Sequence, residues 1–218
     1  MNATETVFND GSKDLDFRIE SDSSTKKFFV DGGNDVVCIN TDSPRGIAST
    51  SNREFQMEGT SGVSSSFSIT RNQNNNGGGA LYLAKTRGTA LGAVTIVQDG
   101  DTLGAIGFAA ADGTDVAHQA ASIGAEVDGT PGANDVPGRI VFKTTPDGST
   151  TLGEVMRINQ SGAVLINTTT DYGGKVNIKS DASGNTVSTL ALVSTLASAA
   201  DGPILDLNRQ TASPADSD

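Results

Sequence analysis

"GEVMRINQSGAVLINT", residues 153–168, reads as two short β-strands joined by a turn at Ser161-Gly162. Apolar and polar residues alternate on both sides of the turn, and this period of two is typical of a half-buried strand. Near the start of the chain, residues 28–41 read "FFVDGGNDVVCINT", which repeats the pattern and ends in the same Ile-Asn-Thr. The two stretches predict equivalent β-hairpins, and therefore a module that occurs twice.

Further matches follow in the same order along the chain. "VVCINT" ends at Thr41 and "AVLINT" at Thr168, an offset of 127 residues. "FQM" at Phe55 matches "VNI" at Val176 with an offset of 121. Leu81 and Leu83 match Leu205 and Leu207 with an offset of 124. Matches that keep their order and spacing indicate tandem modules.

We therefore predict an N-terminal extension over residues 1–12, a first β-rich module over 13–150 and a second, incomplete copy over 151–218. The second copy ends before any counterpart of the "LGAIGF" in the first. We expect either that the native polypeptide continues past residue 218 or that the module pairs its open edge with another chain. Residues 186–200 fit a helix and a strand equally well.

The composition predicts an all-β fold. Leu, Ile, Val and Phe make up only 48 of the 218 residues, close to the level at which disorder is expected, but β-branched residues and Phe dominate this set. The chain also has 26 glycines, and Asp-Gly pairs begin at residues 99, 112, 128 and 147, which are strong hairpin signals. Strands are predicted within residues 16–21, 26–32, 35–41, 65–72, 80–88, 93–100, 102–113, 120–129, 139–148, 154–162 and 163–168.

Charge and hydropathy exclude several classes of partner. The formal net charge is −11, with acidic residues along the whole chain, so phosphate backbones and anionic lipid surfaces are repelled. We expect no nucleic acid partner. No apolar run approaches the roughly 20 residues that span a bilayer, and no secretory signal is visible. The single cysteine, Cys38, lies among Val36, Val37 and Ile39, which predicts a buried thiol in a reducing compartment.

Five stretches resemble segments of tail-fibre and related virion-appendage proteins of tailed bacteriophages, particularly marine ones. They read "DLDFRIESDSSTKKFFVDGGNDVVCINT", "DGDTLGAIGFAAADG", "IGAEVDGTPGANDVPGRIVFKTTPDGS", "EVMRINQSGAVLINT" and "GPILDLNRQTASPAD". The resemblance implies a β-rich, elongated, intertwined homotrimeric fibre in the virion, made in the host cytoplasm. Its partners would be its own copies, other virion tail proteins and a host surface glycan or protein. These motifs mark structure, so no functional residue is carried over.

A trimer also follows from the scarcity of large apolar residues. Three copies around one axis bury a larger fraction of the Val, Leu and Ile side chains, and strands paired between chains leave fewer open edges. Three chains would carry 33 negative charges, three times the 11 of one chain, which favours solubility.

Catalytic, cofactor and metal sites are not expected. His118 is the only histidine and predicts a surface residue, and no G-x-S-x-G motif occurs. Two acidic pairs, Asp112 with Asp115 and Glu126 with Asp128, have the composition of a glycosidase pair, but Asp112 and Asp128 each precede a glycine and indicate turns. Asp31 and Asp35 offer oxygen ligands for calcium, although one Gly-Asp turn lacks the successive repeats of a β-roll.

Three functional hypotheses remain. The first is a non-enzymatic shaft or connector of a tail fibre that supports host recognition and attachment. The second is a capsid-attached fibre or decoration protein, and the third a glycan-degrading tailspike. The absence of Trp and the presence of only two Tyr argue against an adhesive tip, because aromatic anchors dominate binding sites.

Overall fold

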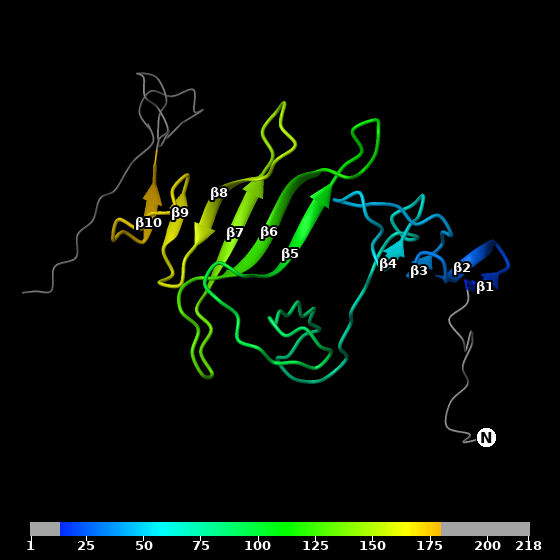
Figure 1. The fold of residues 1–218 in the computed structure, drawn as a ribbon, viewed down its shortest axis with the longest axis horizontal. Coiled ribbons are helices and arrows are strands. Elements are labelled where there is room, and N and C mark those ends of the chain that lie inside the picture. Colours follow the sequence, from blue (N-terminus) through cyan, green and yellow to red (C-terminus); the bar gives the residue numbers. More distant parts are fainter. Residues whose placement is uncertain (1–13, 180–218) are drawn as a thin grey trace, which may run out of the picture. The chain divides into compact units, whose positions relative to one another are not determined.

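The computed structural model describes residues 14–179, and all regular secondary structure in this range is β-strand. The strands form a four-stranded sheet in the order β1-β2-β3-β4 and a six-stranded sheet in the order β10-β9-β8-β7-β6-β5 (Figure 1). The predicted all-β class is confirmed. The second half of the predicted second module, including residues 186–200, Leu205 and Leu207, lies outside the described residues, as does the predicted extension over residues 1–12.

The four-stranded sheet comprises β1 (Phe17–Ser21), β2 (Ser24–Asp31), β3 (Val36–Ile39) and β4 (Phe55–Met57). The first three strands are antiparallel, and β4 joins β3 in parallel. Its buried cluster consists of Phe29, Val36 and Cys38. The prediction that Cys38 is a buried thiol is confirmed. Burial raises the pKa of this thiol, and the negative charge of Asp31 raises it further.

The six-stranded sheet comprises β5 (Thr102–Ala109), β6 (Gln119–Val127), β7 (Gly138–Thr144), β8 (Gly153–Ile158), β9 (Val164–Ile166) and β10 (Val176–Ile178). Strands β5 to β9 are successive antiparallel neighbours. Three of the predicted Asp-Gly turns lie in the hairpin connections, and Gly113, Gly129 and Gly148 all have positive φ. The fourth, with Gly100 at φ 80°, lies directly before β5.

Three predicted strands are absent from the folded chain. Residues 65–72, 80–88 and 93–100 contain no strand, although Phe67, Leu81 and Ile96 have strand-like apolar neighbours two positions away. All three of these side chains are exposed. A strand needs a hydrogen-bonded neighbour, and these segments form no ladder within the described chain. The prediction was therefore wrong for the single chain.

The two hairpins of the sequence repeat, β2–β3 and β8–β9, share local features. Asn40 and Asn167 directly follow β3 and β9, and both adopt left-handed backbone, with φ 64° and 55°. Their backbone N–H groups donate to the carbonyls of Lys27 and Val155, at 3.4 and 2.9 Å. Equivalent hairpins predict that both asparagines face outward or end their strands, and the structure shows that both end them.

The strands that follow the hairpins also correspond. Val37 N–H donates to Glu54 O at 2.7 Å, and Val164 N–H donates to Lys175 O at 2.9 Å. At the centre of β4 and β10 lie the buried amides of Gln56 and Asn177. Each donates from its side-chain nitrogen to the carbonyl three residues earlier, Gln56 to Arg53 and Asn177 to Gly174.

The predicted orientation of the hairpins was wrong for the single chain. If the hairpins are equivalent, alternation predicts that four residues point toward a shared interior: Val37, Ile39, Val164 and Ile166. In the single chain all four are half-buried, and the fully buried neighbours are Cys38 and Leu165. A period of two defines two faces and does not say which one is covered. The predicted module boundary at residues 150 and 151 lies in the connection between β7 and β8, which are neighbours in one sheet.

Candidate functional site

One face of the six-stranded sheet is apolar across five strands. In the strand register, each of the following residues lies opposite the next: Ile106, Ile123, Phe142, Met156 and Ile166. A second row on the same side is formed in the same way by Gly104, Ala125, Ile140, Ile158 and Val164. Directly opposite residues share a face, so the two rows form a continuous surface, here called the apolar face.

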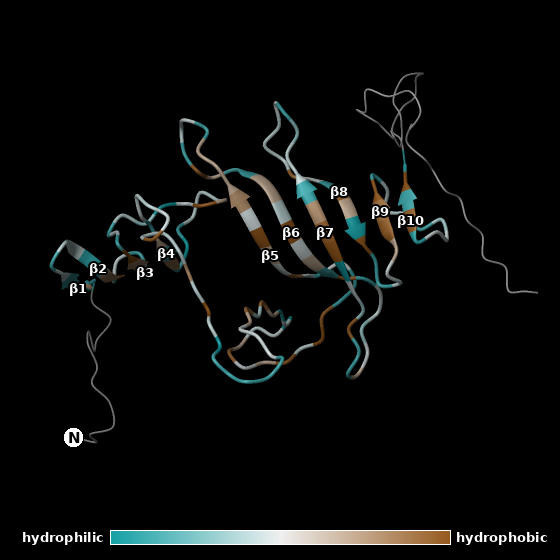
Figure 2. Cartoon of the chain, turned by 180° about the vertical axis from the view of Figure 1, so that it is seen from behind, coloured by the Kyte–Doolittle hydropathy of each residue, from teal (hydrophilic) through white to brown (hydrophobic). Residues whose placement is uncertain are grey.

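The apolar face is open in the single chain. The exposed fractions are 53% for Ile106, 39% for Ile123 and 44% for Ile140, and Phe108 at the end of β5 is 52% exposed. Leu81 and these isoleucines border an open hollow of about 270 Å³. Figure 2 shows hydrophobic, brown positions on β5, β7 and β9. Neither row contains an ionisable residue.

The opposite face carries a lattice of ion pairs. Arg139 on β7 contacts Glu126 through Nη2 and Oε2 at 2.8 Å and Asp128 through Nη1 and Oδ1 at 2.9 Å. Lys143 Nζ lies 3.0 Å from Glu126 Oε1. On β8, Arg157 Nη2 donates to Glu154 Oε2 at 2.6 Å. A bulge between β7 and β8 brings Glu154 opposite Lys143 in the register, so the Arg157–Glu154 pair lies beside the Arg139 cluster on the same face.

Two carboxylates of this lattice, Glu126 and Asp128, are held in the ionised form. Burial opposes ionisation of Glu126, but hydrogen bonds from Arg139 and Lys143 outweigh it and lower the pKa. The pKa of Asp128 is also lowered, because the backbone N–H of Gln160 and the guanidinium of Arg139 outweigh the effect of burial. A general acid for glycoside hydrolysis needs a raised pKa, so this predicted acidic pair has the opposite electrostatics.

The usual distribution of polar and apolar groups is reversed in this sheet. On the charged face, Val141 and Leu165 are fully buried, as expected when Arg and Lys lay their aliphatic stems over apolar neighbours. The side chains of Arg139 and Glu126 are only 15% and 11% exposed. The apolar face is the more open of the two. All buried side-chain polar atoms among residues 14–179 have hydrogen-bond partners.

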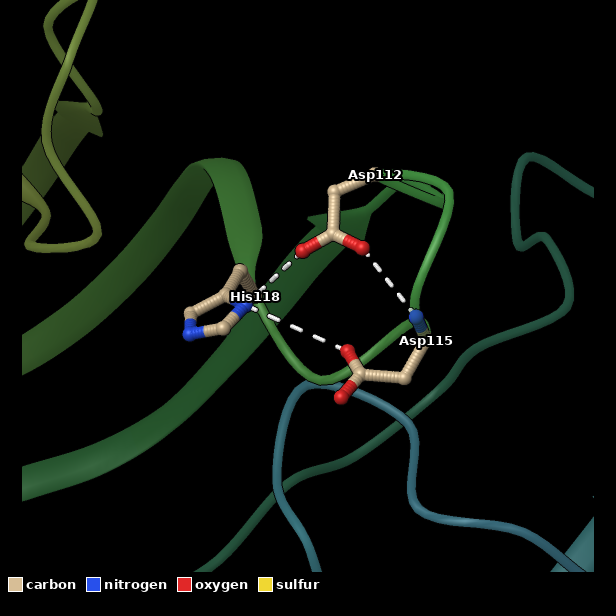
Figure 3. A group of neighbouring side chains, drawn as sticks. All are labelled: Asp112, Asp115 and His118. Carbon is tan, nitrogen blue, oxygen red and sulfur yellow. Dashed lines mark hydrogen bonds and ion pairs between the residues drawn. The ribbon is translucent and has the colours of Figure 1, made fainter.

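Asp112, Asp115 and His118 come together in the β5–β6 connection (Figure 3). His118 Nδ1 lies 3.5 Å from Asp112 Oδ2 and 4.0 Å from Asp115 Oδ1. The ligand atoms of the three side chains lie within 4.8 Å of one another, the only such group among residues 14–179. All three are exposed. The prediction that His118 lies at the surface is confirmed.

The Asp112 carboxylate serves the turn. Its Oδ1 accepts from the backbone N–H groups of Asp115 and Thr114 at 3.1 and 2.8 Å, and these two bonds lower its pKa. Asp115 Oδ1 likewise accepts from Ala117 N–H at 2.8 Å. This is the turn chemistry that the Asp-Gly sequence indicates.

The other predicted ligand candidates are also part of a turn. Asp31 Oδ1 accepts from the backbone of Gly33 and Asn34, and Oδ2 accepts from the Asn34 amide at 2.8 Å. The Asn34 side chain makes the largest contribution to the lowered pKa of Asp31. Asp35 has φ 54°, as expected for a turn residue. These contacts link the β2–β3 connection to its own strand and account for both oxygens of Asp31.

Sequence reasoning missed the basic partners in the sheet. Arg139 and Lys143 lie four residues apart on β7, and Arg157 lies on the next strand, so their proximity to the acidic residues becomes visible only when β6, β7 and β8 are in register. The alternation Arg-Ile-Val-Phe-Lys over residues 139–143 was the available signal, because it places both cations on the side opposite Ile140 and Phe142.

Within residues 14–179, no helix has the length and apolar character needed to cross a membrane. No known protein family model matches the sequence, and no curated protein sequence matches it.

The solved structures with a similar fold include a tail-fibre domain in two forms. The carboxy-terminal domain of the bacteriophage T5 L-shaped tail fibre aligns with 74% of this chain and 68% of its own chain, with a TM-score of 0.53 and 14% identity. The same domain with its intramolecular chaperone aligns with 87% of this chain, which spans half of that longer protein, at the same TM-score and identity. The resemblance to tail-fibre proteins found in the sequence is thus confirmed at the level of fold.

Proposed function

We propose that this chain is a structural segment, a shaft or connector, of a bacteriophage tail fibre that assembles as a homotrimer and supports attachment of the virion to its host. The observation that carries the proposal is the similarity in fold to the T5 tail-fibre domain over 74% of the chain. At 14% identity this similarity concerns the fold, and a fold alone does not define a function. The exposed apolar face and the strand-like segments without a ladder support the proposed assembly further.

Two features support an intertwined assembly. The apolar face is open in the single chain, and large exposed apolar patches mark sites of protein association. Residues 65–72, 80–88 and 93–100 have the alternation of strands but form no ladder with any of the described residues. Copies of the same chain would supply the missing neighbours. Sedimentation of the purified chain tests this: a trimer has three times the mass of the 22.2 kDa chain, and a monomer would refute it.

The absence of enzymatic activity is part of the proposal. Turn hydrogen bonds engage Asp112 and Asp115, and Arg139 holds Glu126 and Asp128 ionised. Incubation with host surface polysaccharide should release no reducing ends, whereas release by the wild-type chain would favour a glycan-degrading tailspike. Further partners would be other virion tail proteins and a host surface glycan or protein. Location on the capsid would favour a decoration protein instead.

A further inference from the structure

The apolar face has the size of half a protein interface. The apolar face, with the neighbouring side chains of Phe108, Leu81 and Leu83, exposes roughly 300–500 Å² if a fully exposed aliphatic side chain offers about 60–120 Å² and an aromatic one up to about 200 Å². A standard interface takes about 800 Å² from each partner, of which somewhat more than half is apolar. The face therefore matches what one stable contact requires.

The hollow on this face fits side chains better than a small ligand. Its volume of about 270 Å³ lies below the usual range of about 300–1,000 Å³ for ligand pockets, and it is open to solvent. Leu81, Leu83, Ile106, Ile123 and Ile140 line it, with no charged group to orient a ligand. Apolar side chains from another protein chain would fill such a hollow.

The distribution of charge favours further copies of this chain as the partners that cover the apolar face. Each copy carries −11, so two copies repel wherever acidic surfaces approach. The register places Glu126, Arg139, Lys143, Glu154 and Arg157 on the opposite side, which leaves the two apolar rows free of charge. Copies that meet through these rows bury no ionisable group, and they therefore avoid the large cost of burying an unpaired charge.

We infer that the apolar face of β5–β9 is the surface through which copies of this chain associate, with the same face of three copies turned toward a common threefold axis. This inference rests on the homotrimer proposed above and adds which of the two sheets, and which of its faces, lies at the axis. The ion-pair lattice then faces outward, where its charges remain partly solvated. The open hollow lined by Leu81 and Ile123 becomes part of a shared core.

Cysteine cross-linking tests the inference without relying on an unfolding variant. Single cysteines replace Ile106, Ile123, Phe142 and Met156, in four variants named Ile106→Cys, Ile123→Cys, Phe142→Cys and Met156→Cys. The control Thr150→Cys places an exposed thiol in the β7–β8 connection, at least as accessible as those in the row. The wild-type chain, whose only thiol is buried at Cys38, is the blank. After mild oxidation, at least one position in the row should give more than half of the chain as covalent dimer, and Thr150→Cys and the wild type should give almost none.

Sedimentation of Ile123→Asp is the second arm. We expect this variant to keep the β-sheet circular dichroism spectrum but to sediment as a monomer, with at least a tenfold weaker association. A trimer that is unaffected by Ile123→Asp and gives no cross-link along the row would overturn the inference and leave the proposed fibre function standing. A wild-type chain that sediments as a monomer would overturn both.

Discussion

Replacing Arg139 with Gln should destabilise the chain more than the loss of any other single cation in the described residues. Arg139 contacts two carboxylates, at 2.8 Å on Glu126 and 2.9 Å on Asp128, and its side chain is only 15% exposed. Glutamine keeps much of the aliphatic stem and removes the charge. Breaking a buried ion pair by removal of one partner costs about 3–5 kcal/mol, because it leaves a desolvated charge unpaired.

Two remaining contacts reduce that cost. Lys143 Nζ stays 3.0 Å from Glu126, and the backbone N–H of Gln160 stays 2.8 Å from Asp128. We therefore expect a loss at the lower end of the range, about 3 kcal/mol at pH 7. With a urea dependence of about 2 kcal/mol per molar, the unfolding midpoint should fall by roughly 1.5 M. Arg45→Gln is the matched control, because its pair with Glu58 is exposed on both sides, and it should cost less than about 1 kcal/mol.

The pH dependence identifies the cause of this loss. The folded-state pKa values of Glu126 and Asp128 are lowered, so their stabilisation is fully present above the ordinary carboxyl pKa and is lost as the pH falls through the folded-state values. The wild type loses this contribution below about pH 4. Arg139→Gln lacks most of this stabilisation at every pH. The difference in unfolding free energy between wild type and variant should therefore narrow on acidification.

Urea unfolding at fixed protein concentration measures this difference. Circular dichroism is the suitable signal, since the chain contains no tryptophan. Midpoints of wild type, Arg139→Gln and Arg45→Gln are compared at pH 7 and at pH 3. Equal stability of Arg139→Gln and wild type at pH 7 would refute the reasoning, and so would a difference that stays constant between the two pH values.

Three further substitutions test local features by the same unfolding assay. Asn167→Ala should cost about 1 kcal/mol because its φ is 55°, whereas Asn167→Gly should be nearly neutral, and equal losses would contradict this. Leu165→Ala should cost about 2–5 kcal/mol because the side chain is fully buried, whereas Leu165→Met should cost less than about 1.5, and a tolerated alanine would argue against a packed site. Asn177→Leu should cost about 1–3 kcal/mol, since it leaves Tyr172 N–H and Gly174 C=O without their side-chain partner, and an unchanged midpoint would speak against that role.

The sequence predicted those parts of the fold that depend on local signals. The hairpins of residues 28–41 and 153–168 follow from alternation and turn residues alone, and the Asp-Gly turns at Asp112, Asp128 and Asp147 lie where hairpins connect. Local signals also located Asn40 and Asn167 at the ends of their strands. They could not say that Cys38 is covered and Ile39 half-open, because which face is covered depends on what packs against it.

The candidate surface depended on information that no local pattern carries. Arg139 meets Glu126 only because β6 and β7 pair in one register, and a shift of one residue would send Arg139 to the other face. The segment at residues 80–88 shows that a local pattern can also predict a strand where the structure has none. Its alternation is real, but a strand requires a ladder of hydrogen bonds. Within the described residues the segment forms no ladder, although Arg87 N–H donates to Thr95 O at 3.2 Å.

Imaging of intact virions that carry this chain tests the central claim most directly. An antibody fragment against the exposed β5–β6 connection, which contains Asp112, Asp115 and His118, would mark the protein on the particle. If the chain is a tail-fibre segment, the label should lie along thin fibres attached to the tail. Label confined to the capsid surface would contradict the account and would identify a head fibre or decoration protein instead.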